Sequence, residues 1–245
     1  MTEILIDNDY LKMTVEAGDE GETVVVSFTG VQSALGGIET GEFARSLRAG
    51  GKARDVYYVI DKTRSWYNAT SPDILATLGP RLAGRRAVAL GNSMGGFGAL
   101  LFQGLLDLRA AIAFCPQFSV HPDVAPFETR WPAYRKAITH WRHDHCFAGG
   151  HAGQCVVFFG RDSTADMEHL RAMLPFFTAD THLFLLGDGG HGVVQVLKAR
   201  GILPQVLDDA IGGDGAAAAI AGRLRDAGIA FEHADGHSIG ALCLP

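Results

Sequence analysis

Short apolar runs separated by tight polar turns open the chain. Three of them, at residues 4–6, 11–15 and 24–28, are joined only by short stretches rich in acidic residues, asparagine and glycine. Runs of this length with such residues between them are typical of β-strands, and connections this short are typical of antiparallel pairs. We therefore expect three neighbouring antiparallel strands at the start of the protein.

Apolar runs with strand character then alternate with stretches of helical character. The strands are expected at residues 55–60, 86–90, 110–114, 154–159 and 181–186, and the helices at 43–47, from 71 onward, at 99–108 and at 167–174. Ser71 caps its helix with Pro72 in the first turn, and Gly79-Pro80 is expected to interrupt that helix. Such alternation predicts right-handed crossovers and parallel strands. The fold class is α/β, with a mixed, mostly parallel sheet of about eight strands and helices on both faces.

Two regions lie outside this alternation. Residues 117–152 separate two strands by more than a crossover helix needs, and residues 204–245 carry an alanine-rich helix at 216–227. The aromatic residues of 117–152 would either cover a pocket at the strand ends as a cap-like insertion or form ordinary core. Because there is no internal repeat and no long linker, we expect residues 1–245 to form a single domain.

Composition narrows the possible partners. Hydrophobic residues make up 47% of the chain, enough for a large core, and the net charge of −6 argues against a nucleic-acid surface. No apolar run is long enough to span a bilayer, and the first nine residues lack the features of a secretion signal. Cys115, Cys146, Cys155 and Cys243 follow no disulfide or metal-binding spacing. We expect a cytoplasmic protein with reduced cysteines, no membrane association and no nucleic-acid partner.

A glycine-rich turn lies between the strand at 86–90 and the apolar helical run that follows it. It reads Gly91-Asn92-Ser93-Met94-Gly95-Gly96. A turn this sharp strains the backbone of Ser93 and leaves no room for side chains at Gly91 and Gly95. It also lifts the hydroxyl of Ser93 above the strand end and aims the backbone N–H of Met94 at whatever the hydroxyl attacks.

Two further reactive side chains follow later strands. Asp162 comes after the strand at 154–159, and His191 comes after the strand at 181–186. Parallel strands place their carboxyl ends at one edge of the sheet, where ligands collect. A histidine can take the proton of a serine hydroxyl, and a carboxylate can orient that histidine. Asp166 is a second candidate for the acid, but we interpret it as a helix cap and favour Asp162.

The order of nucleophile, acid and histidine resembles that of the α/β-hydrolase fold over residues 4–200. The turn around Ser93 is similar to the nucleophile elbow of serine esterases, and Gly189-Gly190-His191-Gly192 is similar to the turn that carries their base. The resemblance implies an oxyanion hole made by two backbone N–H groups. One belongs to Met94; the other would come from Thr29-Gly30-Val31, where threonine replaces the histidine common in the family, so either Val31 or Gly30 could donate.

Histidines of the insertion offer a different kind of site. His140, His143, His145, Cys146 and His151 crowd together, and imidazole and thiolate are zinc ligands. Their spacing matches no ordinary zinc motif, and charged residues interrupt them as on a solvated surface. We therefore predict no metal and no cofactor. Gln117, Phe118 and Trp131 are instead the residues of this segment that we expect to contact the substrate.

The combined prediction is a serine hydrolase that cleaves an ester or thioester of a small molecule through an acyl-enzyme. An acyltransferase with the same three residues is the first alternative, because only the acceptor differs. A catalytically silent binding protein that keeps the fold is the second. The acyl group, the leaving group and the oligomeric state do not follow from the sequence.

Overall fold

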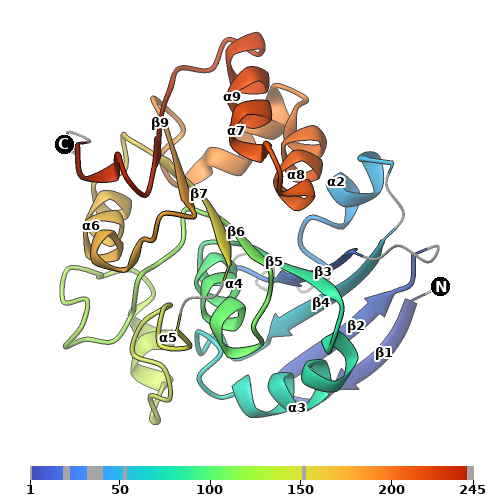
Figure 1. Ribbon diagram of the computed structural model, residues 1–245. Helices are drawn as coiled ribbons and strands as arrows, with labels where there is room; N and C mark the ends of the chain where they lie inside the picture. The colour runs from blue at the N-terminus through green and yellow to red at the C-terminus, as the bar shows by residue number, and fades with distance from the viewer. Residues whose placement is uncertain (1, 19–22, 32–40, 52–53, 151–152, 242–245) are drawn as a thin grey trace.

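A twisted nine-stranded sheet forms the centre of the protein in the computed structural model, which describes residues 2–18, 23–31, 41–51, 54–150 and 153–241 (Figure 1). The strands are β1 (Thr2–Asp7), β2 (Leu11–Glu16), β3 (Thr23–Phe28), β4 (Asp55–Asp61), β5 (Arg86–Asn92), β6 (Ala110–Phe114), β7 (Gln154–Gly160), β8 (Thr181–Leu186) and β9 (Phe231–Asp235). Their order across the sheet is β1-β2-β4-β3-β5-β6-β7-β8-β9. The predicted α/β class and mostly parallel sheet are confirmed.

The opening strands pair differently from the prediction. β1 and β2 are antiparallel, and so are β2 and β4, but β3 lies between β4 and β5 and is parallel to both. The prediction that β3 neighbours β2 is therefore wrong. The reason lies in burial: nearly all of β3 is buried, which suits a central parallel strand, whereas β1 is largely exposed at the edge.

The ninth strand was not predicted. β9 pairs antiparallel with β8 and closes the opposite edge of the sheet. Its sequence, Phe-Glu-His-Ala-Asp, is polar, and Ala234 is its one fully buried residue. An edge strand with one solvated side leaves little hydrophobic pattern to detect, which is why the alanine-rich helix was the only element expected in this region.

Helices cover both faces of the sheet, as predicted (Figure 1). One face packs against α3 (Ser71–Leu82), α4 (Met94–Leu105) and α6 (Thr164–Met173); the other packs against α2 (Ala44–Ala49), α7 (Val193–Ala199), α8 (Leu203–Gly212) and α9 (Ala216–Asp226). Strand β5 shows how the two cores are divided. Ala87 and Ala89 face the first core, whereas Val88 and Leu90 face the second, with the period of two that a pleated strand imposes.

The bounds of α3 and α4 differ from the prediction, and α6 begins at Thr164 rather than at residue 167. α3 continues through Pro80 to Leu82, so Gly79-Pro80 does not interrupt it. Pro80 lies so near the C-terminal end that the hydrogen bond it cannot donate affects only the last turn. α4 begins at Met94 rather than at Ala99, and its first turns contain several glycines. These glycines let the helix pack closely against its neighbours, since a Cβ on Gly98 would lie 2.5 Å from the ring of Tyr67.

The segment between β6 and β7 contains α5 (Pro132–Ala137) and is otherwise irregular over its described residues. Phe118 and Phe147 are buried in the core, while Trp131 and Tyr134 are partly buried against it. Much of the aromatic content of residues 117–152 therefore belongs to the core. The remaining elements are short 3₁₀ helices of the described residues, namely η1 (Leu174–Phe176), η2 (Gly190–Gly192) and η3 (Ile239–Ala241).

Candidate active site

Ser93 occupies the sharp turn between β5 and α4. Its backbone has φ 58° and ψ −118°, a strained conformation for a residue with a side chain. The surrounding chain enforces it: a Cβ on Gly91 would lie 2.0 Å from the carbonyl oxygen of Gly95, and a Cβ on Gly95 would lie 2.2 Å from that of Phe28. The two glycines thus have the steric role that the sequence predicts for them, and Ser93 is held at the carboxyl end of the sheet.

His191 lies on η2, directly after β8, and its ring contacts Ser93. Nε2 of His191 is 2.9 Å from Oγ of Ser93, and Nδ1 is 2.8 Å from Oδ2 of Asp166. His191 is partly exposed, whereas Ser93 and Asp166 are buried. The three side chains form one continuous hydrogen-bonded series.

The carboxylate that contacts His191 belongs to Asp166. The prediction that Asp162 contacts His191 is therefore wrong. Asp162 is exposed, and its Oδ1 accepts a hydrogen bond of 2.6 Å from the backbone N–H of Gly190. It therefore holds the turn that carries His191 instead of contacting the imidazole.

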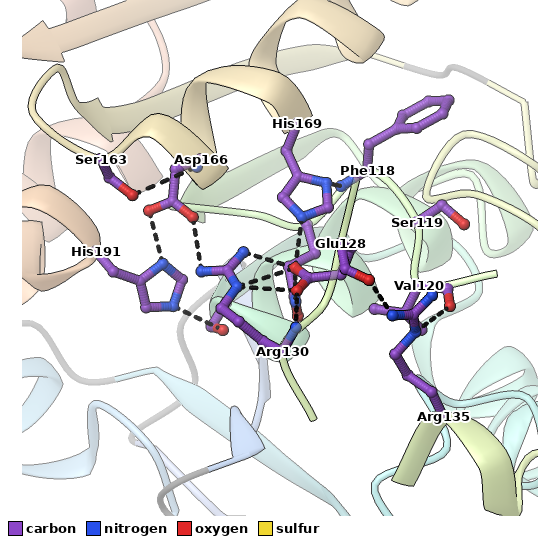
Figure 2. Close-up of polar contacts among 12 residues, drawn as sticks. Phe118, Ser119, Val120, Glu128, Arg130, Arg135, Ser163, Asp166, His169 and His191 are labelled. Atoms are coloured by element: carbon purple, nitrogen blue, oxygen red, sulfur yellow. Dashed lines mark hydrogen bonds and ion pairs between the residues drawn. The ribbon is translucent and has the colours of Figure 1, made fainter. Parts of the chain in front are cut away.

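The prediction that Asp166 caps α6 is also wrong. The cap is Ser163, whose Oγ accepts a hydrogen bond of 3.3 Å from the backbone N–H of Asp166. Asp166 lies in the first turn of the helix, with its carboxylate directed toward His191 (Figure 2). A serine cap with an acidic residue three positions later is a recognisable helix-start pattern, so the sequence did contain the relevant signal.

Burial and hydrogen bonding act in opposite directions on Asp166. Burial alone raises the pKa of the Asp166 carboxyl, but the hydrogen bond from His191 and the nearby charge of Arg130 outweigh it and lower the pKa below its ordinary value. Asp166 therefore remains a carboxylate at neutral pH, the state that can stabilise a protonated imidazole.

The backbone amides predicted to form an oxyanion hole belong to the start of α4 and to the loop after β3. Met94 is the first residue of α4, where a helix leaves N–H groups without intrahelical partners. Gly30 and Val31 line the pocket beside Ser93, but the N–H of Gly30 donates to Oε2 of Glu42 at 2.6 Å. The amide of Gly30 is therefore already engaged, and Val31 is the better candidate of the two for the second donor.

A pocket of about 280 Å³ opens over Ser93. Its described walls are Gly30, Val31, Glu42, Asn92, Ser93, Trp131, His191, Gly192 and Gln195. Three of these residues, Glu42, Asn92 and Gln195, also line an adjoining cavity of about 880 Å³. No local sequence pattern marks Glu42 or Gln195 as pocket residues, because the fold brings them to the site from separate segments.

The three residues of the insertion that we expected at the substrate divide into two groups. Trp131 lines the pocket. Gln117 is fully buried outside it, where its side chain accepts a hydrogen bond from Trp66 and donates one to Glu128. Phe118 stacks on His145 and packs in the core. The expected contact of Gln117 and Phe118 with the substrate is thus wrong, because both side chains serve the interior.

The crowded histidines do not assemble into a metal-binding group over their described residues, and His151 and Cys243 lie outside the described ranges. Within the described ranges, one group of side chains could hold a metal ion, and it consists of Cys115, Asp166 and His191. Their potential ligand atoms all lie within 4.8 Å of one another. Burial raises the pKa of the Cys115 thiol, which keeps it protonated at neutral pH. The ring nitrogens of His191 are already engaged with Ser93 and Asp166.

Comparison with known proteins identifies the fold. No family model and no curated protein matches the chain. Among solved structures, the capsule O-acetyltransferase of Neisseria meningitidis serogroup A is similar, with a TM-score of 0.58 at 13% identity over 84% of this chain and 93% of that one. Est1E from Butyrivibrio proteoclasticus gives 0.58 at 11% identity, covering 86% and 99% of the two chains. The esterase EaEST from Exiguobacterium antarcticum gives 0.56 at 14%, covering 86% and 100%.

The protein therefore has the α/β-hydrolase fold, shared with esterases and with an acetyltransferase, as the sequence resemblance implied. Identities this low establish the architecture and leave the reaction to be argued from the site. Within the described ranges, no helix has the length and apolar character needed to cross a membrane.

Proposed function

We propose that the protein is a serine hydrolase that cleaves a carboxylic ester or thioester through an acyl-enzyme. The observation that carries this proposal is the unbroken series from Ser93 Oγ to His191 Nε2, at 2.9 Å, and from His191 Nδ1 to Asp166, at 2.8 Å. A nucleophile, a base and an orienting acid in hydrogen-bond contact are the arrangement that nucleophilic catalysis by serine requires.

In the first half of the reaction, Oγ of Ser93 attacks the carbonyl carbon while His191 Nε2 takes the hydroxyl proton. Asp166 stabilises the imidazolium that forms. The amides of Met94 and Val31 would donate to the oxyanion of the tetrahedral intermediate, an interaction that commonly contributes about 2.7–4 kcal/mol per donor. His191 then gives its proton to the oxygen or sulfur of the leaving group as the carbon–heteroatom bond breaks.

In the second half, water attacks the acyl group on Ser93, and His191 again takes and returns the proton. The free acid leaves and the hydroxyl of Ser93 is restored. Because the pocket is small and its walls are mostly glycine and polar side chains, a short acyl group fits it best. The adjoining larger cavity would hold the leaving group.

Acyl transfer to an alcohol or amine is the second candidate. Esterases and an O-acetyltransferase share the fold, so the architecture is compatible with either acceptor. The two reactions differ only in what attacks the acyl group on Ser93. Mass spectrometry of products formed with and without an added alcohol would distinguish hydrolysis from transfer.

A panel of p-nitrophenyl esters from acetate to octanoate tests the proposal. Wild type should favour the short esters, and Ser93→Ala should lose nearly all turnover. Ser238→Ala is the matched control, since Ser238 lies in a surface turn after β9, where it hydrogen-bonds Asp235. Unchanged turnover in Ser93→Ala, or an equal loss in Ser238→Ala, would contradict the proposal.

A further inference from the structure

Arg130, from the segment between β6 and β7, contacts the acid on the side opposite His191. Its Nη1 is 3.0 Å from Oδ1 of Asp166, whereas His191 binds Oδ2 (Figure 2). The two oxygens of the carboxylate are thus held by different partners. A carboxylate fixed at both oxygens cannot rotate without breaking a charged hydrogen bond, which is stronger than a bond between neutral groups.

Arg130 itself is fixed by a second carboxylate. Its Nε lies 3.1 Å and 3.0 Å from the two oxygens of Glu128, and its Nη2 lies 2.7 Å from Oε2. The guanidinium therefore joins two carboxylates that come from different parts of the chain. Arg135 donates to the backbone oxygens of Val120 and Glu128, which anchors the loop that carries the pair.

Glu128 is fully buried and has hydrogen-bond contacts with two further side chains. Nε2 of Gln117 donates to it at 2.9 Å, and Nε2 of His169 lies at 2.8 Å. Nδ1 of His169 accepts from the backbone N–H of Phe118, so the ring proton lies on Nε2 and points at Glu128. Burial lowers the pKa of His169, with Glu128 opposing, and the net lowering keeps the ring neutral.

The charges of this cluster sum to −1 before the reaction. Asp166 and Glu128 each contribute −1, Arg130 contributes +1, and the two histidines are neutral. When His191 takes the proton of Ser93, the sum becomes zero. In an interior of low dielectric constant, the step that forms the imidazolium therefore neutralises the cluster instead of charging it.

We propose that Arg130 is a positioning residue for the catalytic acid, dividing its guanidinium between Glu128 and Asp166 so that Asp166 is oriented and one negative charge remains for His191. The proposal rests on the proposed function, because it assigns the role of acid to Asp166. It also means that residues 117–152, which were expected to affect substrate choice, hold part of the catalytic machinery in place.

Several titratable groups face His191 and must be kept unchanged in the test. They are Asp166 from α6, Cys115 after β6, Asp162 through the turn at Gly190, and Glu42 across the pocket. Only the charges of Arg130 and Glu128 are altered in the variants below, so a shift in the pH profile reports on that pair.

Two single variants should move the acidic limb of the kcat/KM profile in opposite directions. Arg130→Gln leaves a cluster charge of −2, which favours protonated His191, so the limb should move to higher pH. Glu128→Gln leaves a charge of zero, so the limb should move to lower pH. Charges at such distances shift titrations by on the order of 1 pH unit.

The double variant Glu128→Gln/Arg130→Gln restores the charge of −1, and its acidic limb should return toward that of wild type. Arg130→Lys keeps the charge but cannot reach both carboxylates with a planar fork, so its limb should stay near that of wild type while kcat falls. Thermal unfolding of each variant shows that the assays are made on folded protein.

A measurement independent of turnover separates this proposal from the proposed function. The low-field proton resonance of the Nδ1–H of His191 is assigned by its loss in His191→Gln and followed with pH. Opposite shifts in Arg130→Gln and Glu128→Gln support the positioning role even if no ester is cleaved. Shifts in the same direction, or none, would overturn it and leave Arg130 with a purely structural role.

Discussion

Replacing Asp166 with asparagine tests the choice of acid most sharply. The substitution keeps the size of the side chain but removes its charge and makes one of the two polar atoms a donor. Arg130 can only donate, so the amide oxygen must face Arg130. The amide nitrogen then faces Nδ1 of His191 and forces the ring proton onto Nε2. A protonated Nε2 cannot accept the proton of Ser93.

The magnitude follows from the contacts. Turning the amide back toward His191 sets an N–H group against Arg130 and loses a charged hydrogen bond worth about 1.5–3 kcal/mol. The imidazolium also exchanges a carboxylate partner for a neutral one, which is roughly half as strong, at a cost of about 0.8–1.5 kcal/mol. The sum of about 2–4.5 kcal/mol corresponds to a loss of about 30- to 2,000-fold in kcat.

Asp162→Asn is the matched control. The oxygen of its amide can still accept the hydrogen bond from Gly190, so the turn that carries His191 should survive. We expect kcat to fall by less than about 10-fold, because at most one surface hydrogen bond is weakened. Both variants are assayed on p-nitrophenyl acetate at a temperature below their measured Tm. A large loss in Asp162→Asn with near-normal rates in Asp166→Asn would refute the assignment.

Three further predictions concern substrate choice and stability. Trp131→Ala should enlarge the pocket and shift the preferred acyl length, because each methylene of contact contributes about 1–3 kcal/mol to discrimination; an unchanged ranking of esters with a lowered Tm would contradict this. Glu42→Gln should raise kcat/KM for an anionic ester such as a hemisuccinate by about 5-fold, because repulsion between the two carboxylates costs about 1 kcal/mol. An equal rise for neutral esters would contradict this prediction. Burial raises the pKa of Glu128, but hydrogen bonds from His169, Arg130 and Gln117 outweigh it and bring the pKa well below its ordinary value. The stability from this lowered pKa is present above the pKa of an unfolded glutamate, about 4.3, and is lost as pH falls below it. The free energy of unfolding, measured in urea, should therefore fall below that pH by up to about 1.4 kcal/mol per pH unit for each proton taken up. The fall should be less steep in Glu128→Gln, and equal slopes in the two proteins would contradict this role of Glu128.

The parts of the structure that the sequence predicts are those with local causes. The turn at Ser93 follows from glycines at Gly91 and Gly95, whose absent side chains are required by the returning backbone. The central strands follow from apolar runs, because strands buried on both faces need them. The exposed strand β9 has no such run and was missed.

The acid was misplaced for a different reason. Asp162 and Asp166 lie in the same stretch after β7, and the choice depends on the residue at which α6 begins. Because Ser163 caps the helix, Asp166 falls in its first turn and faces His191. The contact of Arg130 with Asp166 joins residues 36 positions apart, and no local pattern encodes such a pair.

The central claim is that Ser93 is the activated nucleophile of this site. Treatment with a fluorophosphonate, followed by proteolysis and mass spectrometry, tests it directly. We expect the adduct on the peptide that contains Ser93, formed faster at higher pH because only a neutral His191 can take the hydroxyl proton. Labelling should be lost in Ser93→Ala and strongly slowed in His191→Gln. An adduct on another serine, or no adduct at any pH, would contradict the account.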